Sequence, residues 1–329
     1  MRDDFTWVDG ERLIRFGPAA LSEGPSLLAS RGFDGYALLT TERATATAPA
    51  LVDAAATVLH VPPGPVPEAA AEVRSGVVGR PVVALGGGRV IDSAKAIGGA
   101  DGVAVAAIPT TLSGAEMTPF HRMPAGVEEW KLVRPSLVIG QAELMTSQPM
   151  PGLAASAMNA MAHAIEALYT PLANPVAEDA ALRAVTQIAL GLTIGTRTLA
   201  LGALLAGYAS GSAGFAVHHA VCQTIVRTLG TPHAETNAIM LPHFVRMMEP
   251  RAPRQMELVA AALGNKGTSP SDTIAALSSQ AEVARLSELG VERAALGDVV
   301  EASLQHPALA STPEPPGAEE LEEVLERAL

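Results

Sequence analysis

The segment PVVALGGGRVIDSAKAI, residues 81–97, decides the fold class of this chain. An apolar, β-branched run leads straight into Gly86, Gly87 and Gly88, and residues 90–97 then have the pattern of a helix. Consecutive glycines let a ligand approach the backbone closely, and the amides at a helix start favour a phosphate. The segment is not the G-x-G-x-x-G fingerprint, because its sixth position is Ile91. It therefore predicts either a phosphate-binding strand–loop–helix unit or a plain tight turn.

Strands and helices alternate around this unit through the first half of the chain. We predict strands near LIRF, YALLTT, VLHVPP, VAVAAIPTT and SLVIG, and helices at 50–57 and 68–76, with another after LIRF. Such alternation indicates a parallel, doubly wound α/β sheet, in which ligands bind beyond the carboxyl ends of the strands. Thr41, the loop at Gly86, and Thr110–Thr111 would all lie at that edge.

Strand signals almost vanish after residue 150. Helices are predicted at 151–169, 177–190, 196–210, 213–229, 235–248, 254–263, 271–282, 298–304 and 318–329. We therefore predict two domains, a dinucleotide-binding α/β domain at 1–150 and an all-helical catalytic domain at 151–329.

The first of these helices, PGLAASAMNAMAHAIEALY, is apolar nearly all round and so belongs in a core. Yet Ser156, Asn159, His163 and Glu166 recur at spacings of three and four and share one face. A buried polar stripe must be satisfied or it costs stability. The later segment HHAVCQTIVRTLGTPH offers His218, His219 and His233 as partners. The groups form either one polar pocket or a set of satisfied core residues.

Composition excludes several classes of protein. The formal net charge is −12 and no basic stripe is visible, so no nucleic-acid partner is expected. Cys222 is the sole cysteine, which leaves no disulfide framework and no cysteine-based zinc site. The charged start lacks the apolar core of a signal peptide, and no run approaches the ~18 apolar residues of a membrane span. We expect a soluble, cytoplasmic protein with no membrane partner.

Five segments carry a resemblance to a known family. LGGGRVIDSAKAIG, IPTTLSGAEMTP, MNAMAHAIEALY, HHAVCQTI and GTPHAETNAIMLPH occur in this order along the chain. Together they resemble the signatures of the iron-containing (group III) alcohol dehydrogenase family, which has a dehydroquinate-synthase-like fold. Within that family the chain is most similar to the maleylacetate reductases.

The resemblance implies a cofactor and a set of site residues. NADH or NADPH would bind at positions that include the glycines and nearby polar residues: Thr41, Gly86, Gly87, Gly88, Asp92, Lys95, Thr110 and Thr111. The family's metal ligands would fall on Asn159, His163, His219 and His233, where the first is usually Asp. Because a neutral amide is a weaker ligand than a carboxylate, and maleylacetate reductases share this feature, we expect no tightly bound metal.

The four vestigial ligand positions would then serve as the catalytic residues of a polar, protonatable pocket. His218, His243 and Arg122 are candidates for holding the substrate carboxylate. The implied activity is an NAD(P)H-dependent reductase that transfers hydride to an unsaturated oxo-acid or a related carbonyl compound. The small-molecule substrate would be anionic, and the resemblance suggests a homodimer.

Other functions remain open. An alcohol dehydrogenase or aldehyde reductase of the same family is the nearest alternative. Departures from the family's pattern at Arg89, Ala115, Gln223 and Asn237 also allow a non-redox lyase, isomerase or cyclase on the same fold. A non-catalytic binding or assembly subunit is a third possibility.

Overall fold

The computed structural model describes residues 12–264 and 267–329 of the 329-residue chain. The charged start, for which no signal peptide is predicted, lies mostly outside the described residues. The described chain divides into two compact units, residues 12–147 and residues 148–329. The sequence analysis set its domain boundary at residue 150.

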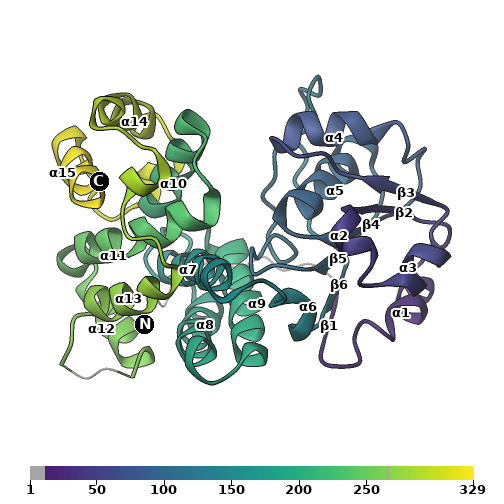
Figure 1. Cartoon of the computed structure of the whole chain (residues 1–329), viewed down its shortest axis with the longest axis horizontal. Coiled ribbons are helices and arrows are strands. Elements are labelled where there is room, and N and C mark those ends of the chain that lie inside the picture. The colour runs from purple at the N-terminus through teal and green to yellow at the C-terminus, as the bar shows by residue number, and fades with distance from the viewer. Residues whose placement is uncertain (1–11, 265–266) are drawn as a thin grey trace. The chain divides into compact units, whose positions relative to one another are not determined.

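The first unit is built on one sheet of six parallel strands (Figure 1). The strands are β1 (Leu13–Phe16), β2 (Ala37–Thr40), β3 (Thr57–His60), β4 (Val82–Gly86), β5 (Val105–Pro109) and β6 (Leu137–Gly140), in the order β1-β6-β5-β4-β2-β3. The strands pair in parallel throughout the sheet, and β4 lies between β2 and β5. The predicted parallel α/β sheet is confirmed. The carboxyl ends of β2, β4 and β5 meet at one edge, as such a sheet requires.

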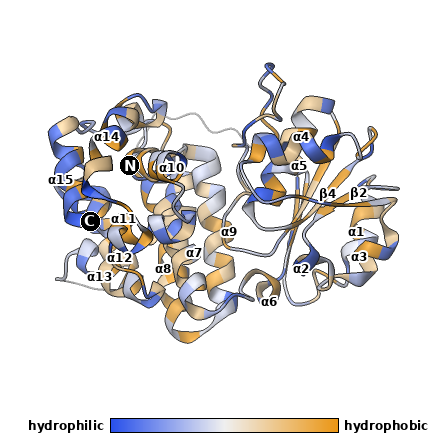
Figure 2. Cartoon of the chain, turned by 45° about the horizontal axis from the view of Figure 1, so that its top comes forward, coloured by the Kyte–Doolittle hydropathy of each residue, from blue (hydrophilic) through white to orange (hydrophobic). Residues whose placement is uncertain are grey.

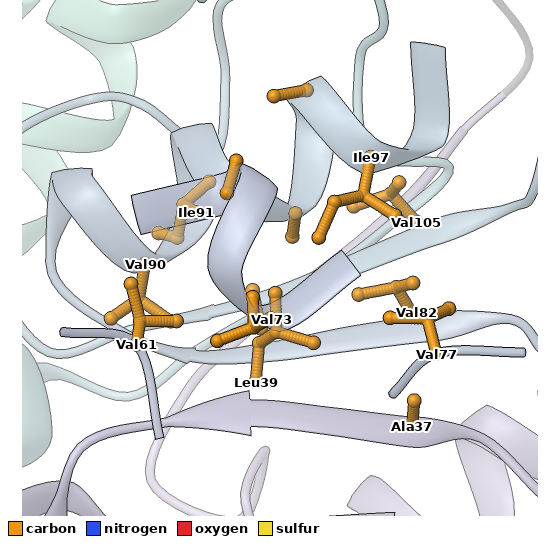
Figure 3. Packing of buried hydrophobic residues seen from close by; sticks show 14 of the residues in the cluster. Ala37, Leu39, Val61, Val73, Val77, Val82, Val90, Ile91, Ile97 and Val105 are labelled. Carbon is orange, nitrogen blue, oxygen red and sulfur yellow. The ribbon is translucent and has the colours of Figure 1, made fainter. Parts of the chain in front are cut away.

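Helices cover both faces of this sheet. They are α1 (Gly24–Ser30), α2 (Glu42–Thr45), α3 (Pro49–Ala54), α4 (Val66–Arg74), α5 (Gly88–Asp101) and α6 (Ala142–Met145). One face packs against α4 and α5, where Leu39, Val82 and Ile97 belong to one buried cluster (Figure 3). The other face packs against α1 and α3 through a second cluster that includes Leu28, Leu38 and Leu51. Alternate residues of β2 thus enter opposite clusters, which makes the sheet doubly covered.

The second unit contains only helices among its described residues. They are α7 (Met150–Ala167), α8 (Pro175–Ile194), α9 (Thr196–Ala213), α10 (Val217–Leu229), α11 (His233–Arg251), α12 (Pro253–Ala262), α13 (Pro270–Ser278), α14 (Leu296–Leu304) and α15 (Ala318–Ala328), with short 3₁₀ turns between 279 and 311. Helix α7 packs against α8, α9, α10, α11 and α13. The predicted helical domain with its buried first helix is confirmed.

Helices α8 and α9 make the closest helix pair in this unit. Both are largely hydrophobic, whereas α15 is amphipathic with a hydrophilic outer face (Figure 2). A Cβ atom added at Gly191 would lie 2.5 Å from the backbone of Leu199, and one at Gly202 would lie 2.9 Å from the Ile188 nitrogen. The two glycines therefore allow backbone to meet backbone. No single helix of the described chain is long and apolar enough to cross a membrane; α9 and α10 reach that length only as a pair bent by 101°.

Candidate active site

The glycine loop lies where β4 ends and α5 begins. Gly87 is the N-cap residue of α5, and no side chain caps the first amides of this helix. A Cβ atom at Gly87 would lie 3.0 Å from Cγ2 of Thr111, and one at Gly88 would lie 3.2 Å from the Ser113 side chain. No acidic residue stands in the first turn. We call Gly86–Gly88 the glycine cradle. It offers backbone without side chains, the free amides at the start of α5 and no nearby negative charge in the first turn, and these are the features that a phosphate site requires.

The threonines after β5 adjoin the cradle. The Thr110 amide donates to the Gly86 carbonyl at 3.0 Å, and the Thr111 side chain lies against Gly87. The structure thus brings these two predicted cofactor residues together with the glycines. Thr41 follows β2 and its hydroxyl caps α2 by accepting from the Ala44 amide at 3.3 Å. Its side chain therefore has a local structural role at the same sheet edge.

Lys95 has a different position from the one predicted. Its side chain is fully buried, and the ammonium donates to the carbonyls of Ala115, Thr118 and Phe120 at 2.9, 3.2 and 2.7 Å. Asp92 Oδ1 lies 2.7 Å away as its counter-ion. Because all the donors of Lys95 are used inside the protein, the predicted phosphate contact is replaced by an indirect role. The Lys95–Asp92 pair holds the loop that supplies Ser113 and Ala115 beside Gly88.

Glu116, in the same loop, is buried without a hydrogen-bond partner on either carboxylate oxygen. Burial raises the pKa of Glu116 to about 7, although the positive charge of Lys95 acts in the opposite direction. Sequence reasoning gave this residue no role. Glu116 follows a loop glycine by two residues, and this pattern does not indicate whether the carboxyl group is buried or exposed.

The second group of candidate residues gathers on α7, α10 and α11. Glu166 of α7 accepts from the backbone amides of His218 and His219 at 2.7 and 3.3 Å. Its other oxygen lies 2.5 Å from Nδ1 of His219. The rings of His163 and His219 stack with centroids 4.0 Å apart. We call Asn159, His163, Glu166, His218 and His219 the histidine centre.

Asn237 links His218 to His233. Its amide nitrogen donates to the His233 carbonyl at 2.7 Å, which turns the amide oxygen toward His218 Nε2 at 2.8 Å. An amide oxygen only accepts, so His218 Nε2 carries a hydrogen. The Asn237 nitrogen also lies 3.4 Å from His233 Nε2. His218 is thus buried with an internal partner, and the structure does not present it to a substrate as predicted.

Three atoms in the centre have no partner. They are Oδ1 of Asn159, Nδ1 of His163 and Nε2 of His219, each buried and without a hydrogen bond. Asn159 and His163 are one turn apart on α7 and so share a face. Buried polar atoms without partners are rare in native proteins and often belong to ligand sites. On the predicted polar face of α7, Glu166 therefore has hydrogen-bond partners, whereas Asn159 Oδ1 and His163 Nδ1 have none.

Burial keeps the imidazoles of the centre neutral. It lowers the pKa of His218 and of His219 to about 3, helped by repulsion from neighbouring imidazoles, and takes that of His163 well below its usual value. Burial also raises the pKa of Glu166, while His218 and the nearby backbone amides act against this rise. Burial thus acts against protonation of His163 and His219, and the protonatable pocket stays a prediction. Taking a second proton would place an ionised ring in a dry site.

The centre does not fit the family's metal ion as it is arranged. Its donor set is neutral, and His233 Nε2 faces the Asn237 amide. Stacked rings, such as those of His163 and His219, send their lone pairs along nearly parallel planes 17° apart. Zinc-type sites need imidazole nitrogens converging at about 2.0–2.1 Å. Among the described residues no three His, Cys, Asp or Glu side chains form a metal-binding group.

The other two predicted substrate residues, His243 and Arg122, belong to different units. His243 of α11 lines a hollow of about 130 Å³ on the α15 side, together with Arg246 and Arg327. Burial and these two arginines lower the pKa of His243. Arg122 is exposed in the first unit, and its carbonyl accepts from His121 at 3.1 Å. The substrate role of these two residues stays a prediction.

Glu166 is the residue that sequence reasoning placed on the polar stripe but gave no role. The spacing of seven from Asn159 identified its face, and its charge inside an apolar helix was the available signal. What the sequence did not show is the partner, since the α10 amides lie about fifty residues further along the chain.

Comparison with known proteins agrees with this architecture. Residues 153–329 match the model of the Fe-containing alcohol dehydrogenase family, C-terminal part. Maleylacetate reductase 1 of Rhodococcus opacus is 39% identical over 55% of this chain and 55% of its own length. The maleylacetate reductase of Pseudomonas knackmussii is 32% identical over 77% of this chain and 78% of its own. The matched part of the chain thus spans about half the length of the first relative.

Solved structures are similar over the whole chain. Maleylacetate reductase from Agrobacterium tumefaciens has a TM-score of 0.87 at 29% identity, and the two chains are covered to 100% and 99%. An iron-containing alcohol dehydrogenase from Corynebacterium glutamicum has a TM-score of 0.90 at 28% identity, with 100% and 98% covered. The chain belongs to the iron-containing alcohol dehydrogenase family. The predicted family and two-domain fold are confirmed.

Proposed function

We propose that this protein is an NAD(P)H-dependent reductase similar to maleylacetate reductase, acting on an unsaturated oxo-acid or a related carbonyl compound. The observation that carries the proposal is the glycine cradle. Gly87 and Gly88 lie so close to the side chains of Thr111 and Ser113 that a Cβ atom at either position would crowd them, and no side chain caps the first amides of α5. The named relatives support the substrate class.

The cradle fits the pyrophosphate of a dinucleotide. The first amides of α5 would donate to the phosphate oxygens, and the Thr111 hydroxyl lies beside Gly87. Lys95 would keep the 115–120 loop in place without touching the ligand. When bound, the reduced nicotinamide supplies the hydride.

The histidine centre would handle the hydroxyl that reduction creates. His219 is neutral with its hydrogen on Nδ1, so Nε2 accepts hydrogen bonds and does not donate one. Asn159 Oδ1 accepts likewise. In this scheme a water bound to these acceptors, not the ring itself, gives a proton to the substrate oxygen and takes one back from the solvent, so that no hydroxide is left in the site.

We also propose that turnover needs no tightly bound metal ion. The neutral donor set and the stacked rings support this, although the family takes its name from iron-binding members. Elemental analysis of the purified protein, with activity measured before and after chelation, tests it. One iron or zinc per chain, with activity lost on its removal, would contradict the proposal.

A substrate panel tests the reductase proposal. Purified protein is mixed with NADH or NADPH and a series of carbonyl compounds: maleylacetate, saturated oxo-acids, aldehydes and ketones. Oxidation of the nicotinamide is followed by its absorbance. We expect the highest kcat/KM with an unsaturated oxo-acid. Turnover of no member of the panel by either cofactor would refute the proposal.

An alcohol dehydrogenase or aldehyde reductase is the second candidate. The similarity to the Corynebacterium glutamicum structure favours it, and the neutral histidine centre offers no cation to a carboxylate. Simple aldehydes would then be the best substrates of the same panel. A cytoplasmic location, the absence of nucleic-acid and membrane partners, and a homodimeric state stay predictions.

A further inference from the structure

We propose that Glu166 is a positioning residue that fixes the tautomer of His219, so that the histidine centre presents hydrogen-bond acceptors and selects a ligand with an O–H donor. The ligand class is a hydroxyl group or a water, not a carboxylate. The inference rests on the proposed reductase function and deepens it.

The geometry around Glu166 is the starting point. This carboxylate is 1% exposed, and one of its oxygens accepts both amides at the start of α10. The N-cap of α10, Ala216, offers no side-chain hydrogen bond. Glu166, on α7, therefore acts as the N-terminal cap of α10. The positive end of the α10 dipole and these amides favour its charged form.

The second oxygen of Glu166 sets the state of the His219 ring. It lies 2.5 Å from Nδ1, and a carboxylate can only accept. The single hydrogen of the neutral imidazole must then be on Nδ1, which leaves a lone pair on Nε2. That Nε2 atom is buried and has no partner in the described structure.

The neighbours of Nε2 make the site selective. Asn159 Oδ1 is a second unpartnered acceptor, one helical turn from His163, whose ring stacks on that of His219. Acceptors repel the lone pairs of a carboxylate and attract an O–H group. The centre would therefore bind the hydroxyl group that reduction forms, or a water beside the substrate's carbonyl group. A carboxylate of the substrate would be bound elsewhere.

Replacing Glu166 by glutamine gives a sharp test. The amide oxygen must still accept the two α10 amides, so the NH₂ group is left facing His219 Nδ1. This group can only donate, and it would move the ring hydrogen to Nε2. Glu166→Gln thus keeps the shape and the α10 contacts of the residue but inverts the tautomer of His219.

The measurement is two-dimensional ¹H–¹⁵N NMR of histidine-labelled, ligand-free protein at pH 7.5, which distinguishes protonated from unprotonated ring nitrogens. His219 is assigned by its loss in His219→Gln. We expect a protonated Nδ1 in the wild type and a protonated Nε2 in Glu166→Gln. Glu178→Gln, on α8, is the matched control and should match the wild type.

A protonated Nε2 in the wild type would overturn the proposal, since the ring would then be either an imidazolium or the tautomer that donates from Nε2. This result needs no variant, so misfolding of Glu166→Gln cannot hide it. An unchanged tautomer in a folded Glu166→Gln would overturn it too. If the proposed reductase activity exists, kcat should fall about 10²- to 10⁴-fold in the variant, the usual range for proton-transfer catalysis. Because the NMR measurement involves no turnover, failure of the reductase proposal would be seen separately.

Discussion

Asn159 places a neutral amide in the histidine centre, whose imidazoles are kept neutral by burial. Burial accordingly lowers the pKa of His218 and His219 to about 3. We therefore expect the centre to bind a polar, uncharged group. A carboxylate on the substrate must be recognised by groups outside it.

Glu116 makes the stability of the protein depend on pH. Burial raises its pKa from 4.5 to about 7, so the folded chain holds this proton more tightly than the unfolded chain. The stability that this proton provides is complete below pH 4.5 and is lost as pH rises through 7. The linkage relation puts the loss at about 3 kcal/mol of unfolding free energy.

Glu116→Gln has no proton to lose. Relative to the wild type, its free energy of unfolding should therefore improve by about 3 kcal/mol between pH 4.5 and pH 8. Urea denaturation of both proteins at the two pH values measures this difference. Glu257→Gln, an exposed change on α12, is the control and should show no comparable trend. Parallel pH profiles for wild type and Glu116→Gln would show that Glu116 ionises normally.

At the scale of single elements, the contact of α8 with α9 depends on glycine. A methyl group at Gly191 would press on the Leu199 backbone from 2.5 Å. Backbone cannot rotate away as a side chain can, so Gly191→Ala must separate the helices. We expect a loss of roughly 1–3 kcal/mol in the free energy of unfolding, as for other overpacked sites.

Gly297→Ala provides the comparison for this loss. Gly297 lies in α14 with nothing within 4 Å of an added Cβ. The change should be neutral or stabilising, because alanine favours helix by about 0.5–1 kcal/mol over glycine. Equal stability of the Gly191→Ala and Gly297→Ala proteins in chemical denaturation would argue against close α8–α9 packing.

The start of α5 is the element on which cofactor binding depends. In Gly87→Val the new side chain would meet Thr111 from 3.0 Å and fill the glycine cradle. We expect the Kd for NADH to rise by at least about tenfold, or 1.4 kcal/mol, with an unchanged circular dichroism spectrum. Gly297→Ala again serves as the control. NADH binding of wild-type strength in a folded Gly87→Val protein would place the dinucleotide elsewhere.

Sequence patterns predicted elements well and side-chain partners poorly. The apolar run before Gly86 and the unbroken apolar helix at 151–169 identified β4 and α7, because burial on both sides leaves a clear pattern. The pattern did not show that Lys95 turns inward to the 115–120 carbonyls. Nor did it show that Glu166 meets the start of α10. Such contacts join segments distant in sequence, and a spacing rule does not contain them.

At the scale of the whole molecule, the two units divide the chemistry. The parallel sheet offers bare backbone at one edge for a phosphate, and the helical unit offers a neutral, buried set of acceptors. The sequence predicted this division from the loss of strand signals after residue 150. It also predicted, from the amide at Asn159, that no metal ion is tightly bound, and this stays a prediction.

The most direct measurement is calorimetric titration of metal-stripped protein with NADH and NADPH, after elemental analysis of the protein as purified. The account predicts that one of the two nucleotides binds with a stoichiometry of one per chain without any metal. Absence of binding by both nucleotides, with or without added metal, would contradict it, because the glycine cradle would then hold no dinucleotide.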